Sequence, residues 1–305
     1  MPVAGLAFSE VAASLTDLAD SVFAEATHSL TPSLATRRYA EETDGQFMYG
    51  HLLRVIALGV AGAAQHAEVF GRLLGDGSNP LPTFTVARAG TTAAARTGYL
   101  VEPNIEARER LRRAANDVLY ALSEVDRILV DSRRKILHSV LTDVLENEEQ
   151  IDRIVGGLHG EEGARAEILE WGKSPAVGFQ TLPKGRGGWK YLAEEGATER
   201  RPSDMEAIER ILGRNEDGWR PGMGAAFFQT TSSVMHSSAH GLAAASMGAD
   251  ATPSEVLRGA TVDGLVANCF AGCLVRLGHD LGRFGGVEQE GWEAATDRLL
   301  SHFDG

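Results

Sequence analysis

The sequence predicts an all-α protein, an irregular antiparallel bundle of about eight to ten helices. Apolar residues recur at helical spacing along most of the chain. No segment alternates apolar and polar residues in the way that predicts a half-buried strand. Of 305 residues, 43% are hydrophobic and 23% are charged, values typical of a globular protein with a substantial core.

The N-terminal region, residues 1–158, is expected to consist of successive amphipathic helices. Apolar and acidic positions alternate at helical spacing over residues 6–30, and Pro32 is expected to close this first helix. Residues 33–46 are polar and charged, which predicts a connector.

Two less polar helices are predicted next. Residues 47–74 form a long apolar segment, in which Gly59 and Gly62 would let a neighbouring helix approach closely. After a break rich in Gly and Pro, residues 82–100 predict a helix of Ala, Gly and Thr that carries two arginines.

A strongly charged helix is expected to begin at Ile105, with Asn104 as its N-cap. Its apolar positions from Leu111 to Leu129 share one face, and its charges are expected on the other face. A further helix is predicted over residues 134–158.

The second half of the chain changes character. Residues 159–222 are rich in Gly and charge, which predicts an irregular excursion with short helices near 161–171 and 203–213. Residues 223–305 predict further helices, which are expected to pack with residues 1–158 as one domain.

The segment Pro221–Ala249 contains no Lys, Arg, Asp or Glu. On a helical wheel its aromatic and aliphatic residues share one side. A solvated face normally carries Lys and Glu, so a polar face without them is expected to contact protein, ordered water or a ligand. The polar side carries Gln229, Ser232, Ser233, His236 and His240.

This polar face and the arginines of the earlier helix define the candidate site. Arg88 and Arg96 lie two turns apart among Ala, Gly and Thr, where guanidinium groups need partners. In an enzyme, a histidine would act as general acid or base and an arginine would stabilise a phosphate-like anion. The expected catalytic residues are Ser233, His236 and His240, and the expected substrate-binding residues are Arg88, Arg96 and Gln229. No cofactor or metal ion is expected.

Two stretches carry a family resemblance. VARAGTTAAARTGYLVEPNIEARERLRR and FFQTTSSVMHSSAHG, which cover about a fifth of the chain, resemble helical proteins of actinobacteria. The second stretch is similar to the Tyr/Phe-x-x-x-Ser-x-x-x-His-like helix of HEPN-related defence and toxin proteins. The resemblance implies an all-α homodimer, in some members with RNA cleavage at the dimer cleft, and a site at Ser233, His236 and His240. This chain differs from the family in one respect, because no arginine precedes His236 at the Arg-x4-6-His spacing of HEPN ribonucleases. Arg133 and His138 have that spacing instead.

Two other functions stay open. In a non-catalytic interaction or regulatory protein, the same polar face would be a hydrogen-bonded helix interface. In a metal-dependent hydrolase, His240, His279 and Asp280 would be the site, because LGHDLG resembles the His-Asp core of HD-superfamily phosphohydrolases.

Charge and composition limit the partners. With 29 basic and 42 acidic residues the net charge is −13, which disfavours a surface adapted mainly to nucleic-acid phosphates. The expected partners are a second copy of the chain, RNA or another protein. No membrane partner is expected, and the N-terminus lacks a signal-peptide pattern, so the protein is expected in the cytoplasm. Cys269 and Cys273, one turn apart in an apolar stretch, are expected to be small core residues in a reducing compartment.

Overall fold

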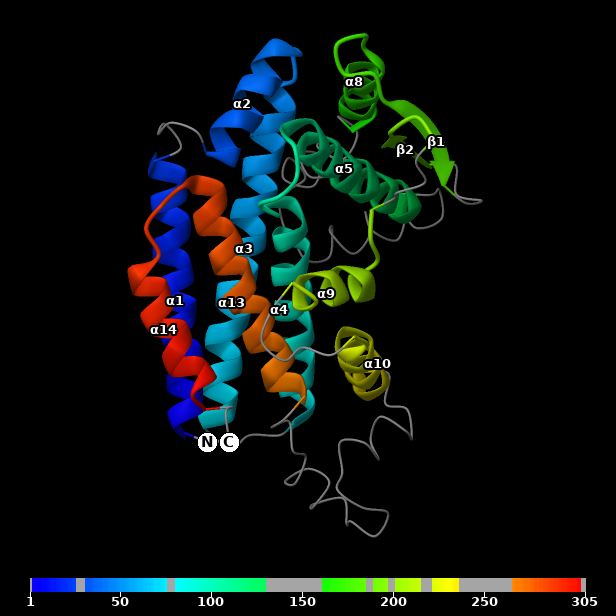
Figure 1. Cartoon of the computed structure of the whole chain (residues 1–305). Coiled ribbons are helices and arrows are strands. Elements are labelled where there is room, and N and C mark those ends of the chain that lie inside the picture. Colours follow the sequence, from blue (N-terminus) through cyan, green and yellow to red (C-terminus); the bar gives the residue numbers. More distant parts are fainter. Residues whose placement is uncertain are drawn as a thin grey trace, which may run out of the picture. The chain divides into compact units, whose positions relative to one another are not determined.

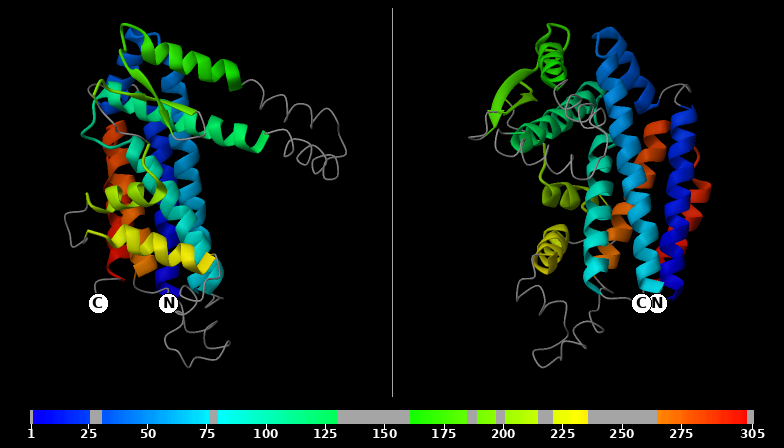
Figure 2. Two further views of the ribbon diagram at one scale, coloured as in Figure 1. Left: turned by 90° about the vertical axis from the view of Figure 1, so that its right-hand side faces the viewer. Right: turned by 180° about the vertical axis from the view of Figure 1, so that it is seen from behind.

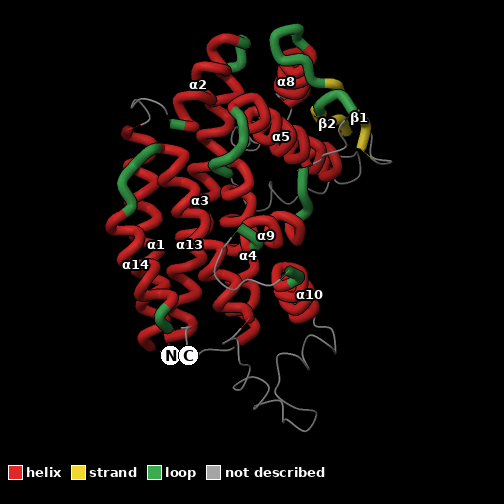
Figure 3. The backbone as a smooth tube through the Cα atoms, in the orientation of Figure 1, coloured by secondary structure: helices red, strands yellow, loops and turns green. Residues whose placement is uncertain are grey.

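The computed structural model confirms the predicted all-α class (Figure 1). Ten helices and one two-stranded sheet make up the described part of the chain (Figure 3). The described residues are 2–25, 31–75, 80–129, 161–184, 189–196, 201–214, 221–235 and 265–302. They fall into two compact units. The first unit comprises Met1–Ala35, Leu53–Ile105 and Pro202–Gly305, and the second comprises Thr36–Leu52 and Glu106–Arg201.

In its described residues, the first unit is a bundle of four long helices and one short helix, with two further short helices on one side (Figure 2). Three phenylalanines form the centre of its core, with Phe8 on α1, Phe70 on α3 and Phe270 on α13; their ring centroids lie 4.7 to 5.6 Å apart. The shorter helices α9 and α10 pack on each other and on α4. The bounds are α1 Pro2–Glu25, α3 Gln46–Gly75, α4 Pro80–Leu100, α9 Asp204–Leu212, α10 Met223–Met235, α13 Leu265–Gly285 and α14 Glu290–Leu300.

Close packing of α3 on α4 depends on Gly59, one of the two glycines that the sequence singled out. A Cβ atom added at Gly59 would clash with the Thr97 side chain of α4, and one added at Gly62 would lie 3.7 Å from the Cβ atom of Ala93. The prediction of a close approach is therefore confirmed for Gly59, whereas a Cβ atom at Gly62 would make only an ordinary van der Waals contact. By length and composition α3 is also able to cross a membrane, a test that the core helix of a soluble protein passes as well.

The second unit is built around α5 and a hairpin. The strands pair antiparallel, with Thr181 opposite Leu192. Asn116 of α5 joins the hairpin to the helix, because its side chain donates to the Leu192 carbonyl (2.9 Å) and accepts from the Leu192 amide (2.7 Å). The bounds are α2 Pro32–Glu42, α5 Ala107–Leu129, α8 Glu161–Lys173, β1 Gln180–Lys184 and β2 Trp189–Ala193. The short helices near 161–171 and 203–213 are confirmed by α8 and α9, whereas the hairpin was not predicted.

The structure corrects two predictions about helix ends. The expected connector at 33–46 is largely helix α2, and Pro32 begins that helix instead of closing the one before it. Thr31 is its N-cap, since its Oγ1 accepts a hydrogen bond from the Leu34 amide at 3.1 Å. The charged helix α5 begins at Ala107, two residues after the predicted start, so Asn104 is not its N-cap.

The expected separation of faces on α5 holds for the apolar residues and fails for the arginines. Leu111, Ala115 and Leu119 are buried as predicted, but so are Arg110, Arg112 and Arg113. The arginines were expected in solvent, and they are buried because the second unit supplies acceptors, including Glu109. The helix predicted at 134–158 lies outside the described residues.

Candidate functional site

The candidate site lies where α4 meets α10. The half-buried Arg88 of α4 donates a hydrogen bond from Nη1 to Ser232 Oγ of α10, at 2.6 Å. Its guanidinium carbon also lies 4.3 Å from the ring centroid of Phe228, in cation–π geometry. Phe228 and Ser232 are four residues apart, so they share one side of α10 and contact one cation together.

The neighbouring side of α10 belongs to the core. Phe227 and Thr231 are fully buried, and Thr231 Oγ1 donates to the Phe227 carbonyl at 2.9 Å. The buried side of α10 and the Arg88 side are therefore adjacent stripes of the same uncharged helix. An uncharged sequence suits this position, because a charged side chain facing the core would lose its hydration.

The other predicted site residues are distributed as follows. Arg96, two turns further along α4, forms an ion pair with Asp204 at the start of α9, with Nε 2.7 Å from Oδ1. Gln229 is exposed on α10, and Ser233 lies in the last turn of that helix. His236 and His240 lie outside the described residues. The structure thus brings Arg88 to α10, the helix that carries the serines, whereas Arg96 contacts α9.

Phe228 was expected on the apolar side of the helix, and Ser232 was expected on its polar side but without a role in the site; the sequence nevertheless contained a signal that joins the two. Phe228, Ser232, His236 and His240 follow one another at intervals of four residues. Residues at that spacing form a single stripe on a helix. Ser233, which was expected in the site, lies one residue out of this register.

A second cluster of charges lies inside the first unit. The fully buried Asp280 of α13 lies 3.0 Å from Nη2 of Arg214 and 3.0 Å from Nε of Arg276. Arg214 also approaches Glu102, with Nη1 3.7 Å from Oε1. Burial raises the pKa of Asp280 although both arginines act to lower it, and burial lowers the pKa of Arg214.

The surroundings of Asp280 do not suit a metal ion. Two guanidinium groups form ion pairs with its carboxylate. Nδ1 of the neighbouring His279 lies 2.8 Å from Gln289 Oε1. Among the described residues, no group of three or more His, Cys, Asp or Glu side chains is placed to hold a metal ion. The geometry around His279 and Asp280 therefore gives no support to the metal-dependent hydrolase, whose third residue, His240, is not described.

The arginines of the second unit have structural contacts. Arg108 Nη1 donates to both carboxylate oxygens of Glu194, at 2.6 and 2.7 Å, and its Nε donates to the Val177 carbonyl at 2.9 Å. Arg201 contacts Asp117 at 2.6 Å and lies over the ring of Tyr120. These contacts tie the segments around the hairpin to α5, so we assign them to stability.

Fold and site together define a class: an all-α protein with an arginine, an aromatic ring and a serine joined at a contact between two helices. The chain matches no protein-family model, no curated protein and no solved structure. The functional argument therefore depends on the geometry of this site.

Proposed function

We propose that the chain is a HEPN-like, homodimeric cytoplasmic protein that binds RNA at the α4–α10 site and cleaves it. The observation that carries the proposal is the contact of Arg88 with Phe228 and Ser232. In the sequence, His236 and His240 follow these two residues at the same spacing of four, and we propose that they extend the stripe. An arginine beside such a stripe would set a phosphate-binding cation next to two groups able to transfer protons.

The proposed reaction is a transesterification within the RNA strand. One histidine removes the proton of a 2′-hydroxyl group, and the 2′-oxygen attacks the adjacent phosphorus. The bond from phosphorus to the 5′-oxygen breaks, and the other histidine protonates that oxygen. The products are a 2′,3′-cyclic phosphate and a 5′-hydroxyl end. Arg88 would stabilise the negative charge that develops on the phosphate oxygens.

A second candidate function is a non-catalytic interaction protein. It is favoured by the ion pair of Arg96 with Asp204, since an arginine on the same helix serves a contact between helices. In that case the contact of Arg88 with Ser232 also holds two helices, α4 and α10, together. The net charge of −13 also favours a partner other than nucleic acid.

Cleavage rates of matched variants separate the two functions. Wild type, Arg88→Gln, His236→Ala and Arg54→Gln would be incubated with defined transcripts after circular dichroism shows equal folding. Arg54 is an exposed arginine on α3, so its variant is the control for loss of one positive charge. The nuclease proposal predicts that His236→Ala and Arg88→Gln slow cleavage at least about 100-fold and that Arg54→Gln has the wild-type rate. If no preparation cleaves RNA and His236→Ala melts at a lower temperature, the interaction protein is supported.

A further inference from the structure

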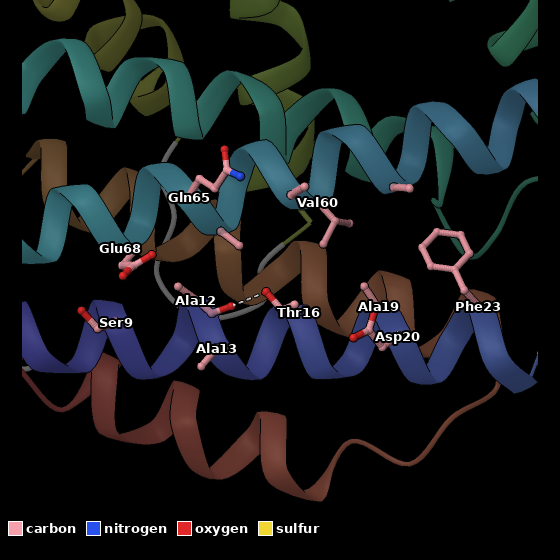
Figure 4. A pocket seen from close by; sticks show the side chains of 13 residues that line it. Ser9, Ala12, Ala13, Thr16, Ala19, Asp20, Phe23, Val60, Gln65 and Glu68 are labelled. Carbon is pink, nitrogen blue, oxygen red and sulfur yellow. Dashed lines mark hydrogen bonds between the residues drawn. The ribbon is translucent and has the colours of Figure 1, made fainter.

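A groove of about 470 Å³ runs between α1 and α3 on the first unit (Figure 4). Its floor includes the buried Ala12, Ala19 and Ala64, and the small side chains leave the space between the two helices unfilled. Phe23 stands at one end of the groove, and Glu68 lies towards the other (Figure 4). The hollow is elongated and follows the helix axes, as a site for an additional helix would.

Exposed apolar residues lie about one helical turn from residues that line this groove. The large hydrophobic side chains exposed in the described part of the chain are Leu58 (68%), Leu6 (61%) and Val69 (43%), all on α1 or α3. Leu58 precedes the groove residue Ala61 by three positions, so both lie on one side of α3. Single exposed leucines are ordinary, but several beside one apolar groove indicate an interaction surface.

The charges of the groove distinguish between possible occupants. Its described lining contains two carboxylates, Asp20 and Glu68, and no Lys or Arg. Arg72 contacts Glu68 but does not line the groove. A second copy that packed groove against groove would bring these carboxylates towards their counterparts, and an anionic lipid surface would also repel them. A positively charged partner is the complementary one.

We infer that the α1–α3 groove binds an amphipathic helix of another protein, whose apolar stripe is flanked by Lys or Arg. From Ser9 to Phe23 the lining of α1 extends for about 21 Å, the length of about four helical turns. Alanines on the floor let a helix approach closely, Leu58 and Val69 add apolar area beside it, and Asp20 and Glu68 meet the basic flanks. The inference does not depend on RNA cleavage at the α4–α10 site.

Synthetic helical peptides test the inference by fluorescence anisotropy with the full chain. The first probe has a Leu/Ala stripe flanked by Lys, the second has the same stripe flanked by Glu, and the third has the Lys content with the stripe scrambled. The blocking variant is Ala61→Arg, which fills the groove from an exposed position, and its control is Ala294→Arg at an exposed position of α14. The charge variant is Asp20→Asn combined with Glu68→Gln.

The expected result is that the Lys-flanked amphipathic probe binds at least ten times more tightly than either other probe. Ala61→Arg should weaken this binding at least tenfold and Ala294→Arg should leave it unchanged, while the charge variant should weaken it and reduce its dependence on salt. Equal binding of the Lys-flanked and Glu-flanked probes, or normal binding by Ala61→Arg, would overturn the inference.

Two further measurements assign the groove to another occupant if the inference is wrong. Light scattering that shows a wild-type dimer and an Ala61→Arg monomer would make the groove an interface between copies of this chain. Binding to phosphatidylcholine or phosphatidylglycerol vesicles that Ala61→Arg abolishes would make it a membrane-facing surface. Either result contradicts the basic-helix partner.

Discussion

Replacing Glu109 by Gln should destabilise the second unit strongly. Its carboxylate accepts hydrogen bonds from Nε and Nη2 of Arg112, at 2.7 and 2.8 Å, and from Nε of Arg113 at 2.7 Å. The side chains of Arg112 and Arg113 are only 2% and 3% exposed. Gln keeps the shape of the side chain but removes a negative charge that contacts two buried cations.

The magnitude follows from the burial of these groups. Removing one partner of a buried ion pair costs about 3–5 kcal/mol, because the remaining charge is no longer compensated. Arg112 also donates to the Leu192 carbonyl at 3.2 Å, so it retains an acceptor in the variant. We therefore expect a loss of about 3 kcal/mol in the free energy of unfolding at neutral pH, at the lower end of that range.

The loss should depend on pH with a definite sign. Burial alone would raise the pKa of Glu109, but hydrogen bonds from Arg112 and Arg113, together with their charges, lower it below the ordinary value of 4.5. A carboxylate with a lowered pKa stabilises the fold above 4.5 and loses that contribution as the pH falls through its folded-state pKa. The difference between wild type and Glu109→Gln should therefore be full at pH 7 and shrink on acidification.

Urea unfolding followed by circular dichroism, at neutral and acidic pH, measures both quantities. The matched control is Glu106→Gln, which removes an exposed carboxylate just before the same helix and should change stability by less than about 0.5 kcal/mol. The reasoning is refuted if Glu109→Gln is no less stable than Glu106→Gln, or if its deficit is unchanged by acidification.

Three other predictions concern the core. Gly59→Ala should destabilise by about 1–3 kcal/mol because its Cβ would clash with α4, whereas Gly50→Ala, whose Cβ meets no described atom within 4 Å, should stabilise by up to about 1 kcal/mol; equal urea midpoints would contradict this. Asn116→Ala should cost about 2 kcal/mol by leaving the buried Leu192 amide without this acceptor, although Arg112 still donates to the Leu192 carbonyl, and the exposed Asn104→Ala, its control, should melt like wild type. A thiol reagent should label Cys269 only on unfolding, since burial raises its pKa to about 12, and rapid labelling of the folded protein would refute that burial.

Helices with one apolar side were predictable because their pattern is local. The apolar segment at 47–74 predicted α3 to within one residue at each end. The Thr31–Pro32 pair was misinterpreted because proline fits both after one helix and in the first turn of the next. The Thr31 hydroxyl accepts a hydrogen bond from the Leu34 amide, and this bond caps the helix that follows the proline.

Contacts between distant segments were not predictable from local patterns. The sequence indicated that the arginines near residue 110 were charged, but not that Glu109 and the Leu192 carbonyl would accept their hydrogen bonds in a buried position. The hairpin was not predicted because its strands are five residues each and lack a clear alternation of apolar and polar residues.

The candidate site shows the same limit. Sequence reasoning selected Arg88 and the uncharged helix separately, and their contact joins residues 144 positions apart. It also selected Arg96 by the same argument, yet that residue pairs with Asp204. Both arginines lie in a segment of Ala, Gly and Thr, where an arginine was expected to bind a ligand. Only the packing of α9 and α10 on α4 distinguishes them.

The most direct test of the proposed function is the chemical nature of the RNA ends. A defined transcript would be incubated with wild type and with His236→Ala of equal folding, and the products analysed by mass spectrometry. The proposal predicts 2′,3′-cyclic phosphate and 5′-hydroxyl ends from wild type and at least about 100-fold less of both from His236→Ala. The same products at the same rate from both proteins, or no products from either, would contradict it.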